Sequence, residues 1–166
     1  MGTTNMTIHW EFPTSQIQRG LFKDGILARQ WAETYPSIFD AQDLKIALNQ
    51  PDYHFYEWLA AVMFWHSIGY LSLVEKYEFK RHKRQQEILR KLIPSDLFVL
   101  VTDHRQEFGN TQVPDLLVYA PDMSDWFFCE VKGGTDRLRP EQENEFRIFS
   151  ELSKKPIYMI EIKPIR

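Results

Sequence analysis

The distribution of apolar positions changes in character near Pro94. Before this proline, apolar residues recur at helical spacing. After it they gather in short runs, rich in β-branched and aromatic residues, that turn residues separate. The pattern therefore predicts a helical region over residues 1–93 that packs on a mixed α/β core over residues 94–166, the two parts forming one compact unit.

Three helices are expected in the first region. One begins after Asp40, whose side chain suits the N-cap position, and stops before Pro51. The next is strongly apolar, extends from about residue 52 to 71, and ends near Gly69. The third covers the basic stretch 75–93, whose few apolar residues are spaced for one face of a helix.

The second region predicts the element order β-β-β-α-β. The expected strands and helix are, in chain order, 96–104, 114–120, 126–132, the helix 139–155 and the strand 156–164. Pro140 suits the first position of the helix. A strand–helix–strand passage favours parallel pairing of the last two strands, joined by a crossover. The expected fold class is therefore α/β with a mixed central sheet.

Composition limits the class of protein. With 166 residues, of which 43% are hydrophobic and 14% aromatic, the chain can bury a sizeable core, which excludes a disordered protein. The single cysteine, Cys129, excludes an internal disulfide and a zinc site of several thiolates. No signal-peptide pattern opens the sequence, and its longest wholly apolar run, 58–65, is too short to span a bilayer. We therefore expect a cytoplasmic protein without a membrane partner.

Charge is unevenly distributed along the chain. The formal net charge of −3 argues against a generic nucleic-acid coat, which is usually basic. Residues 76–91, however, contain seven Lys or Arg against two Glu, a local excess of +5. Such a stretch is either a solvated helix face or a phosphate-binding surface. Its candidate phosphate ligands are Lys80, Arg81, Lys83 and Arg84.

Two acidic residues are expected to meet across a hairpin. If residues 121–124 form its loop, Asp115 lies directly opposite Glu130, and Lys132 shares their face because side chains alternate along a strand. Opposed carboxylates, with Cβ atoms about 5 Å apart, repel one another. A hard divalent cation such as Mg²⁺ or Mn²⁺ would relieve that repulsion. In the alternative interpretation, Glu130 and Lys132 form an edge-strand ion pair and Asp115 caps a turn.

The same residues carry a resemblance to a known family. The segment "VPDLLVY", a gap of ten residues and then "EVK" resembles the PD-(D/E)XK nuclease superfamily. The longer segment "EVKGGTDRLRPEQ" is similar to the VRR-Nuc branch, in which Glu-x-Lys precedes a Gly/Pro turn, Asp-x-Leu and a Gln. The resemblance covers about residues 95–165 and implies a restriction-endonuclease-like core. Gln112, where the family usually has Gly, and Arg139, where Ser is common, depart from the pattern.

The resemblance implies roles for individual residues. Asp115 and Glu130 would bind Mg²⁺ or Mn²⁺ together with the backbone carbonyl of Val131. Lys132 would orient and activate the attacking water. Gln142 lies on one helical stripe with two phenylalanines, where it either reaches the catalytic site or caps the local backbone.

Further candidates surround this set. Many such nucleases add a carboxylate from a preceding helix, for which Glu57 is the first candidate, Glu87 is its rival, and a structural role for both remains open. Arg137 and Arg139, which follow the Glu-x-Lys segment, are additional candidate phosphate ligands.

These residues predict a metal-dependent nuclease that hydrolyses DNA, with branched or flapped DNA from repair or recombination as one substrate class. A restriction-like or toxin-like nuclease would use the same chemistry, with its specificity supplied by the helical region. A catalytically silent nucleic-acid-binding module of the same fold and a plain interaction domain are non-enzymatic alternatives. A homodimer would suit the resolution of a symmetric junction.

Overall fold

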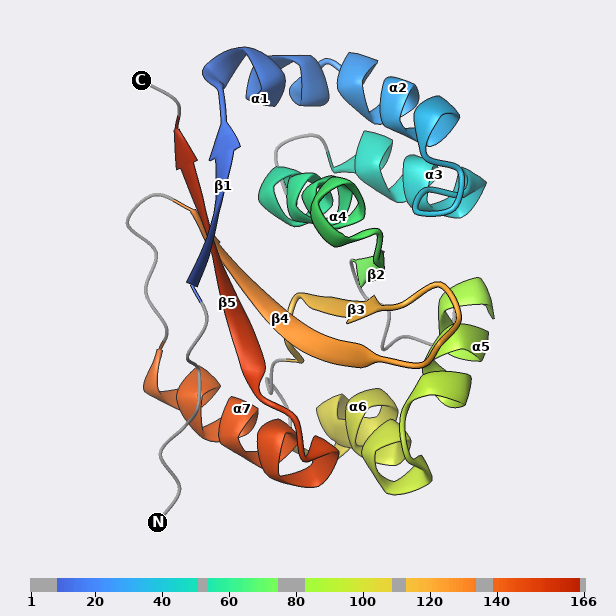
Figure 1. Cartoon of the computed structure of the whole chain (residues 1–166), viewed down its shortest axis with the longest axis vertical. Helices are drawn as coiled ribbons and strands as arrows, with labels where there is room; N and C mark the ends of the chain where they lie inside the picture. Colours follow the sequence, from blue (N-terminus) through green and yellow to red (C-terminus); the bar gives the residue numbers. More distant parts are fainter. Residues whose placement is uncertain (1–8, 51–53, 75–82, 109–112, 134–138, 165–166) are drawn as a thin grey trace.

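The computed structural model describes residues 9–50, 54–74, 83–108, 113–133 and 139–164 (Figure 1). Within them a five-stranded mixed sheet is covered on both faces by helices. The elements are β1 (His9–Thr14), α1 (Gln16–Lys23), α2 (Ile26–Thr34), α3 (Ala41–Asn49), α4 (Phe55–Ile68), β2 (Leu71–Val74), α5 (Lys83–Leu92), α6 (Ser95–Phe108), β3 (Leu116–Tyr119), β4 (Trp126–Gly133), α7 (Pro140–Ser153) and β5 (Ile157–Pro164). The predicted α/β class with a mixed central sheet is confirmed.

The sheet has the strand order β1-β5-β4-β3-β2. Strands β2, β3 and β4 are antiparallel neighbours, and β5 pairs in parallel with both β4 and β1. The predicted parallel pairing of the last two strands is therefore confirmed. Helix α7 makes the crossover between them, as a parallel connection requires.

One predicted strand is wrong. The segment 96–104 lies in helix α6. A continuous apolar run is ambiguous between a buried strand and a buried helix, and here the burial follows helical spacing. Leu97 and Val101 are buried four residues apart, whereas Val99 between them is 54% exposed. The first strand of the antiparallel set is instead β2, so the order β-β-β-α-β is made by β2, β3, β4, α7 and β5.

The predicted boundary near Pro94 is also wrong as a division between helices and sheet. Strands β1 and β2, both from residues 1–93, form the two edges of the same sheet as β3, β4 and β5. Pro13, which cannot donate a backbone hydrogen bond, is tolerated in β1 because β1 is an edge strand. Residues 1–93 therefore contribute two strands to the central sheet, on which they were expected only to pack as helices.

Several helix ends agree with the sequence. Asp40 is the N-cap of α3, and its Oδ1 accepts a 2.8 Å hydrogen bond from the backbone N–H of Asp43. Gly69 ends α4 in the left-handed conformation, with φ of 70°, which glycine adopts without strain. Pro140 is the first residue of α7. Helix α4 begins at Phe55, later than expected, and α5 is described from Lys83 onward.

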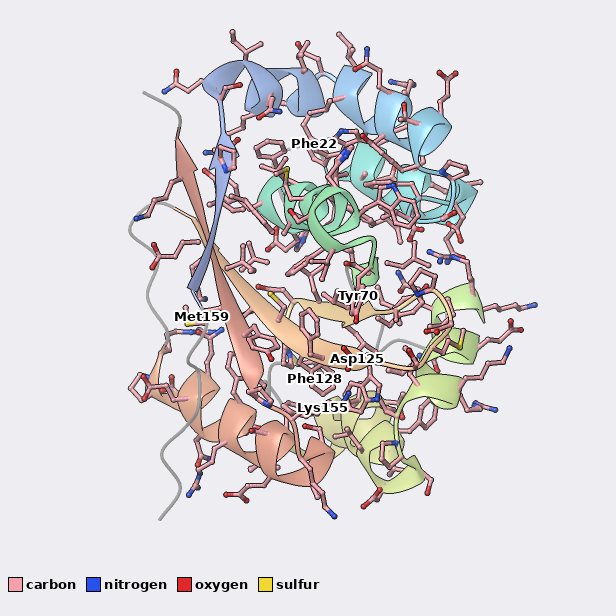
Figure 2. All side chains as sticks on the ribbon, viewed as in Figure 1. Phe22, Tyr70, Asp125, Phe128, Lys155 and Met159 are labelled. Carbon is pink, nitrogen blue, oxygen red and sulfur yellow. The ribbon has the colours of Figure 1, made fainter. Side chains whose placement is uncertain are left out.

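The two faces of the sheet bury separate cores. Phe22 belongs to the cluster between the sheet and α1–α4, and Phe128 belongs to the cluster beneath α5–α7 (Figure 2). Along β4, Cys129 and Val131 face the first cluster, so Glu130 and Lys132, which alternate with them, face the side of α7. Within the described segments, no helix combines the length and apolar character needed to cross a bilayer.

A surface cluster anchors the β3–β4 hairpin. The hydroxyl of Tyr70 donates to Asp125 Oδ2 at 2.9 Å, and Lys155 Nζ donates to Asp125 Oδ1 at 3.2 Å and to the backbone oxygen of Trp126 at 2.6 Å (Figure 2). These contacts join the hairpin to the segments that precede β2 and β5. The ladder pairs Tyr119 with Trp126, which is the predicted register.

Candidate active site

The hairpin brings the carboxyl groups of Asp115 and Glu130 together, and we call these two residues the carboxylate pair. Asp115 immediately precedes β3, and its Oδ2 accepts a 2.9 Å hydrogen bond from the backbone N–H of Val131. Glu130 lies within β4 and is only 2% exposed. The side chains of the pair are hydrogen-bonded to each other. They therefore share one face of the sheet, as the register predicted.

The carboxylate pair is electrostatically strained. Burial, the negative charge of Asp115 and the hydrogen bond to it together raise the pKa of Glu130 well above its ordinary value. Burial also raises the pKa of Asp115, and the charge of Glu57 adds to this effect. Two adjacent carboxyl groups resist double ionisation, which favours one proton shared between them. A cation could replace that proton.

Lys132 only partly compensates for this negative charge. Its Nζ lies 3.9 Å from Glu130 Oε2, and its side chain is 16% exposed. The ammonium charge lowers the pKa of both members of the pair, but their pKa values stay raised. The alternative interpretation of an edge-strand ion pair does not describe this geometry, because Glu130 is buried in the middle of the sheet beside a second carboxyl group.

Gln142 contacts the carboxylate pair and caps the backbone at the same time. Its Nε2 donates to Glu130 Oε2 at 3.2 Å, while its Oε1 accepts from the backbone N–H of Arg139 at 3.1 Å and lies 3.5 Å from Lys132 Nζ. The side chain is held in place because Phe146 and other apolar residues of α7 are buried against the sheet. The two roles that the sequence left as alternatives therefore coexist.

The two candidate carboxylates from helices, Glu57 and Glu87, lie in different parts of the structure. Glu57, in the first turn of α4, is close enough to Asp115 for its charge to raise the pKa of Asp115. Its side chain is 21% exposed and lies 3.9 Å from the ring nitrogen of His54. Glu87 instead lines a groove between α5 and α6. The structure thus brings the first candidate, and not its rival, near the carboxylate pair.

Sequence reasoning missed the packing that places α4. Gly133 follows Lys132 in the chain, and a Cβ atom at this position would lie 2.5 Å from Cε2 of the Tyr56 ring. Tyr56 precedes Glu57, so this close approach seats the first turn of α4 against the end of β4. Arg19 of α1 donates to the Tyr56 hydroxyl at 3.2 Å and stacks on its ring. Only the glycine after Glu-x-Lys could have indicated this contact in advance.

A further acidic residue lies beside the Lys132 position. Glu161 on β5 is the ladder partner of Lys132, so its side chain emerges on the same face of the sheet. Lys163 Nζ lies 3.5 Å from Glu161 Oε2. The sequence predicted the parallel pairing of β5 with β4, but it did not give the register that places Glu161 beside Lys132.

Three of the six candidate phosphate ligands lie in the described part of the chain. Lys83, at the start of α5, and Arg139, immediately before α7, are exposed. Lys80, Arg81 and Arg137 lie outside the described residues. The remaining residue, Arg84, has a structural role.

The guanidinium of Arg84 joins α5 to the start of α3. Its Nε lies 2.8 Å from Asp40 Oδ2, and its Nη2 lies 2.7 Å from Oδ2 of Asp43, whose side chain is 1% exposed. Two carboxylates therefore neutralise this guanidinium, which argues against phosphate binding by Arg84.

The carboxylate pair provides two acidic ligands. Among the residues that the structure describes, no group of three or more His, Cys, Asp or Glu side chains is arranged to hold a metal ion. Cys129 alternates with Glu130 along β4, so its thiol faces the cluster beneath α1–α4 on the opposite side of the sheet, where burial and the neighbouring acids raise its pKa well above the ordinary value. A cation at this site would therefore depend on Asp115, Glu130 and backbone oxygens.

Comparison of the chain with protein-family models, with curated proteins and with solved structures gave no match.

Proposed function

We propose that this protein is a Mg²⁺- or Mn²⁺-dependent nuclease that hydrolyses phosphodiester bonds in DNA. The observation that carries the proposal is the buried carboxylate pair with Lys132 beside it. Burying two hydrogen-bonded carboxyl groups disfavours their ionisation, which gives the fold no advantage unless a cation or reacting group uses them. Branched or flapped DNA is the substrate class we favour.

The residues fit a hard divalent cation. Mg²⁺ and Mn²⁺ prefer oxygen ligands and are commonly bound through one or two carboxylates, with water and phosphate oxygens completing the coordination. Asp115 and Glu130 would supply those carboxylates, and the carbonyl of Val131 lies in the same strand as Glu130. Glu57 is the candidate for an additional, outer contact because its charge already acts on Asp115.

Each side chain has a role in this proposal. The cation would supply charge compensation for the phosphate as negative charge develops on it. Lys132, which is 16% exposed, orients the attacking water and stabilises that developing charge with its ammonium group. Gln142 holds Glu130 through its Nε2 and lies beside Lys132 through its Oε1, so it fixes both relative to the start of α7. It acts as a positioning residue.

The element order supports the same proposal. The elements β2, β3, β4, α7 and β5, with β2–β4 antiparallel and β5 parallel to β4, follow the β-β-β-α-β order expected from the resemblance, but the first strand is 71–74 and not 96–104. Helices α5 and α6 would then be an insertion between the first two strands of that arrangement.

A cleavage assay tests the proposal. Purified protein is incubated with linear, flapped and four-way DNA, with Mn²⁺ or with EDTA, beside Asp115→Ala and Lys132→Ala. We expect metal-dependent cleavage by the wild type, and a loss of at least about 100-fold in both variants. Asp24→Asn and Lys45→Gln, which change exposed residues on α1's end and on α3, serve as matched controls and should cut normally. DNA binding without cleavage by the wild type would favour the silent binding module.

A further inference from the structure

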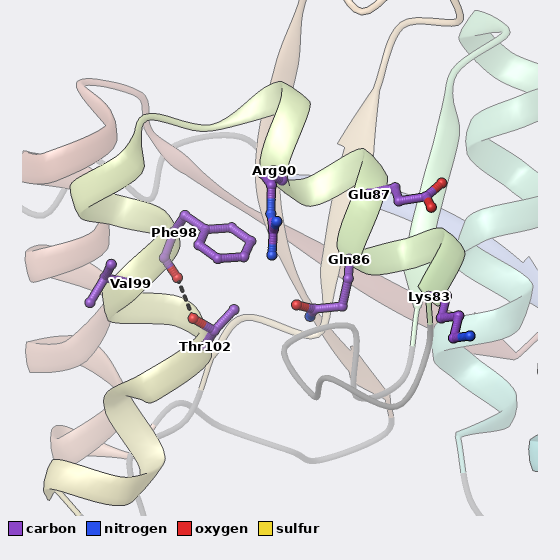
Figure 3. A pocket seen from close by; sticks show the side chains of 7 residues that line it. All are labelled: Lys83, Gln86, Glu87, Arg90, Phe98, Val99 and Thr102. Atoms are coloured by element: carbon purple, nitrogen blue, oxygen red, sulfur yellow. Dashed lines mark hydrogen bonds between the residues drawn. The ribbon is translucent and has the colours of Figure 1, made fainter.

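Helices α5 and α6 form the two walls of an open groove on the molecular surface (Figure 3). Its volume of about 390 Å³ falls within the roughly 300–1,000 Å³ typical of ligand pockets. The residues that line it, which define the α5–α6 groove, are Lys83, Gln86, Glu87, Arg90, Phe98, Val99 and Thr102.

The groove combines a planar surface with positive charge. The guanidinium carbon of Arg90 lies 5.1 Å from the centre of the Phe98 ring. Figure 3 shows Arg90 and Gln86 extending from α5 toward α6, whereas the carboxylate of Glu87 is directed away from α6. Thr102 donates its hydroxyl hydrogen to the backbone oxygen of Phe98 at 2.8 Å, so its hydroxyl oxygen can still accept a hydrogen bond. The side of the groove that faces α6 is thus cationic and aromatic.

The cations of the groove contrast with Arg84 on the same helix. Arg84 is bound by two carboxylates, but in the described part of the chain neither Lys83 nor Arg90 forms an ion pair. Beside them, Val99 is 54% exposed, and Phe98 is only partly buried. Exposed apolar surface next to the Arg90 guanidinium favours a ligand that is both flat and anionic.

Single-stranded nucleic acid has this chemistry. Its bases offer flat faces that stack on aromatic rings and guanidinium planes, and its phosphates are bound by Lys and Arg. A duplex keeps its bases stacked inside, so its grooves and phosphates are the parts that a protein can reach. An acidic peptide would match the cations of the groove but not the planar Arg90–Phe98 pair.

We propose that the α5–α6 groove binds an unpaired nucleotide in a single-stranded arm of the substrate. The base packs on the Arg90–Phe98 pair, Gln86 hydrogen-bonds to the base edge, and Lys83 contacts a phosphate at the rim. The inference rests on the proposed nuclease function and names the substrate as nucleic acid with a single-stranded segment.

The groove and the carboxylate pair lie on the same side of the sheet. Leu89 of α5 and Leu97 of α6 pack in one cluster with Phe128 of β4. Phe128 and Glu130 are two residues apart in that strand and point to the same face. A single strand held by the groove is therefore on the face of the sheet that carries the carboxylate pair.

Fluorescence anisotropy in EDTA tests the groove without requiring cleavage. The probes are a fluorescent oligo-dT single strand and a blunt duplex of the same length. We expect Phe98→Leu and Arg90→Gln each to weaken single-strand binding about tenfold, since one base–aromatic contact is lost. Lys83→Gln should lower the salt dependence of binding by about the contribution of one phosphate. Lys45→Gln, on α3, is the matched control and should bind as the wild type does.

The outcomes separate the groove from the nuclease proposal. Single-strand binding that is unchanged in Phe98→Leu and Arg90→Gln, or equally weakened in Lys45→Gln, would overturn the groove assignment, even if the protein cuts DNA. Displacement of the fluorescent oligo-dT by polyglutamate at a lower concentration than by unlabelled oligo-dT would also overturn it, in favour of an acidic partner. Groove-dependent binding by a protein that never cuts would support the groove and reject the nuclease. Circular dichroism spectra of the variants establish that each is folded.

Discussion

Replacing Glu130 with Gln should stabilise the metal-free protein at alkaline pH. The substitution keeps the shape of the side chain and an oxygen that can accept the hydrogen bond from Gln142 Nε2. It removes the second ionisable group next to Asp115, and the new amide can donate to the Asp115 carboxylate in place of the shared proton. The repulsion within the carboxylate pair is therefore replaced by a hydrogen bond.

The magnitude follows from the geometry. Two unit charges about 4 Å apart interact with about 4 kcal/mol at an effective dielectric constant of 20. The wild type avoids part of this repulsion by keeping one proton, and Lys132 compensates for another part. We therefore expect Glu130→Gln to raise the free energy of unfolding by about 1–3 kcal/mol at about pH 8. For a chain of this size that is a rise in Tm of about 2–10 °C.

The pH dependence has a definite sign. The pKa of Glu130 is raised in the folded state, so its protonation stabilises the fold fully below the ordinary glutamate pKa of about 4.3. This stabilisation is lost as the pH rises through the folded-state value. The metal-free wild type should thus be less stable at about pH 8 than at about pH 5. The variant should lose less stability over the same interval.

Thermal unfolding at about pH 5 and about pH 8, in EDTA and in Mn²⁺, measures these differences. Mn²⁺ should raise the Tm of the wild type at about pH 8 and leave that of Glu130→Gln almost unchanged. Glu151→Gln, an exposed change on α7, is the control and should follow the wild type. If Glu130→Gln destabilised the metal-free protein at about pH 8, Glu130 would be a partner of a favourable ion pair with Lys132, and the reasoning behind the metal site would be refuted.

Two further substitutions test how the surrounding structure is held. Gly133→Ala should lower the free energy of unfolding by about 1–3 kcal/mol, because its Cβ would lie 2.5 Å from Tyr56 Cε2 and force the ring to move. Gly20→Ala, where a Cβ meets no atom within 4 Å, should instead stabilise the protein by about 0.5–1 kcal/mol, and equal effects in thermal unfolding would argue against the contact. Arg84→Met should cost about 3 kcal/mol in urea denaturation, since it leaves the buried carboxylate of Asp43 with less compensation; a cost below about 1 kcal/mol would contradict that role.

The parts of the fold that sequence could predict depend on nearby residues. The hairpin register follows from its short loop, and with it the meeting of Asp115 and Glu130. The starts of α3 and α7 follow from a capping aspartate and from Pro140, because both act within one turn of the helix.

The remainder depends on partners far away in the chain. Strand β2 has four residues, too few for a period to be read, and it is defined by its pairing with β3. The apolar run 96–104 fits either a strand or a helix until α5 and α7 supply its packing surface. The nearness of Glu57 to Asp115 likewise depends on how α4 is seated, which the Tyr56–Gly133 contact decides.

The pairing of β1 with β5 affects how the chain folds while it is being synthesised. His9 pairs with Met159, so β1 leaves the ribosome long before β5, its partner in the sheet, has been synthesised. Contacts so distant in sequence slow folding, because a long loop must close before they form. Until then, the backbone donors and acceptors of the first strand are open to pairing with other chains. Yield in expression should therefore depend strongly on temperature and synthesis rate, and a tag that occludes either strand should interfere with closure of the sheet.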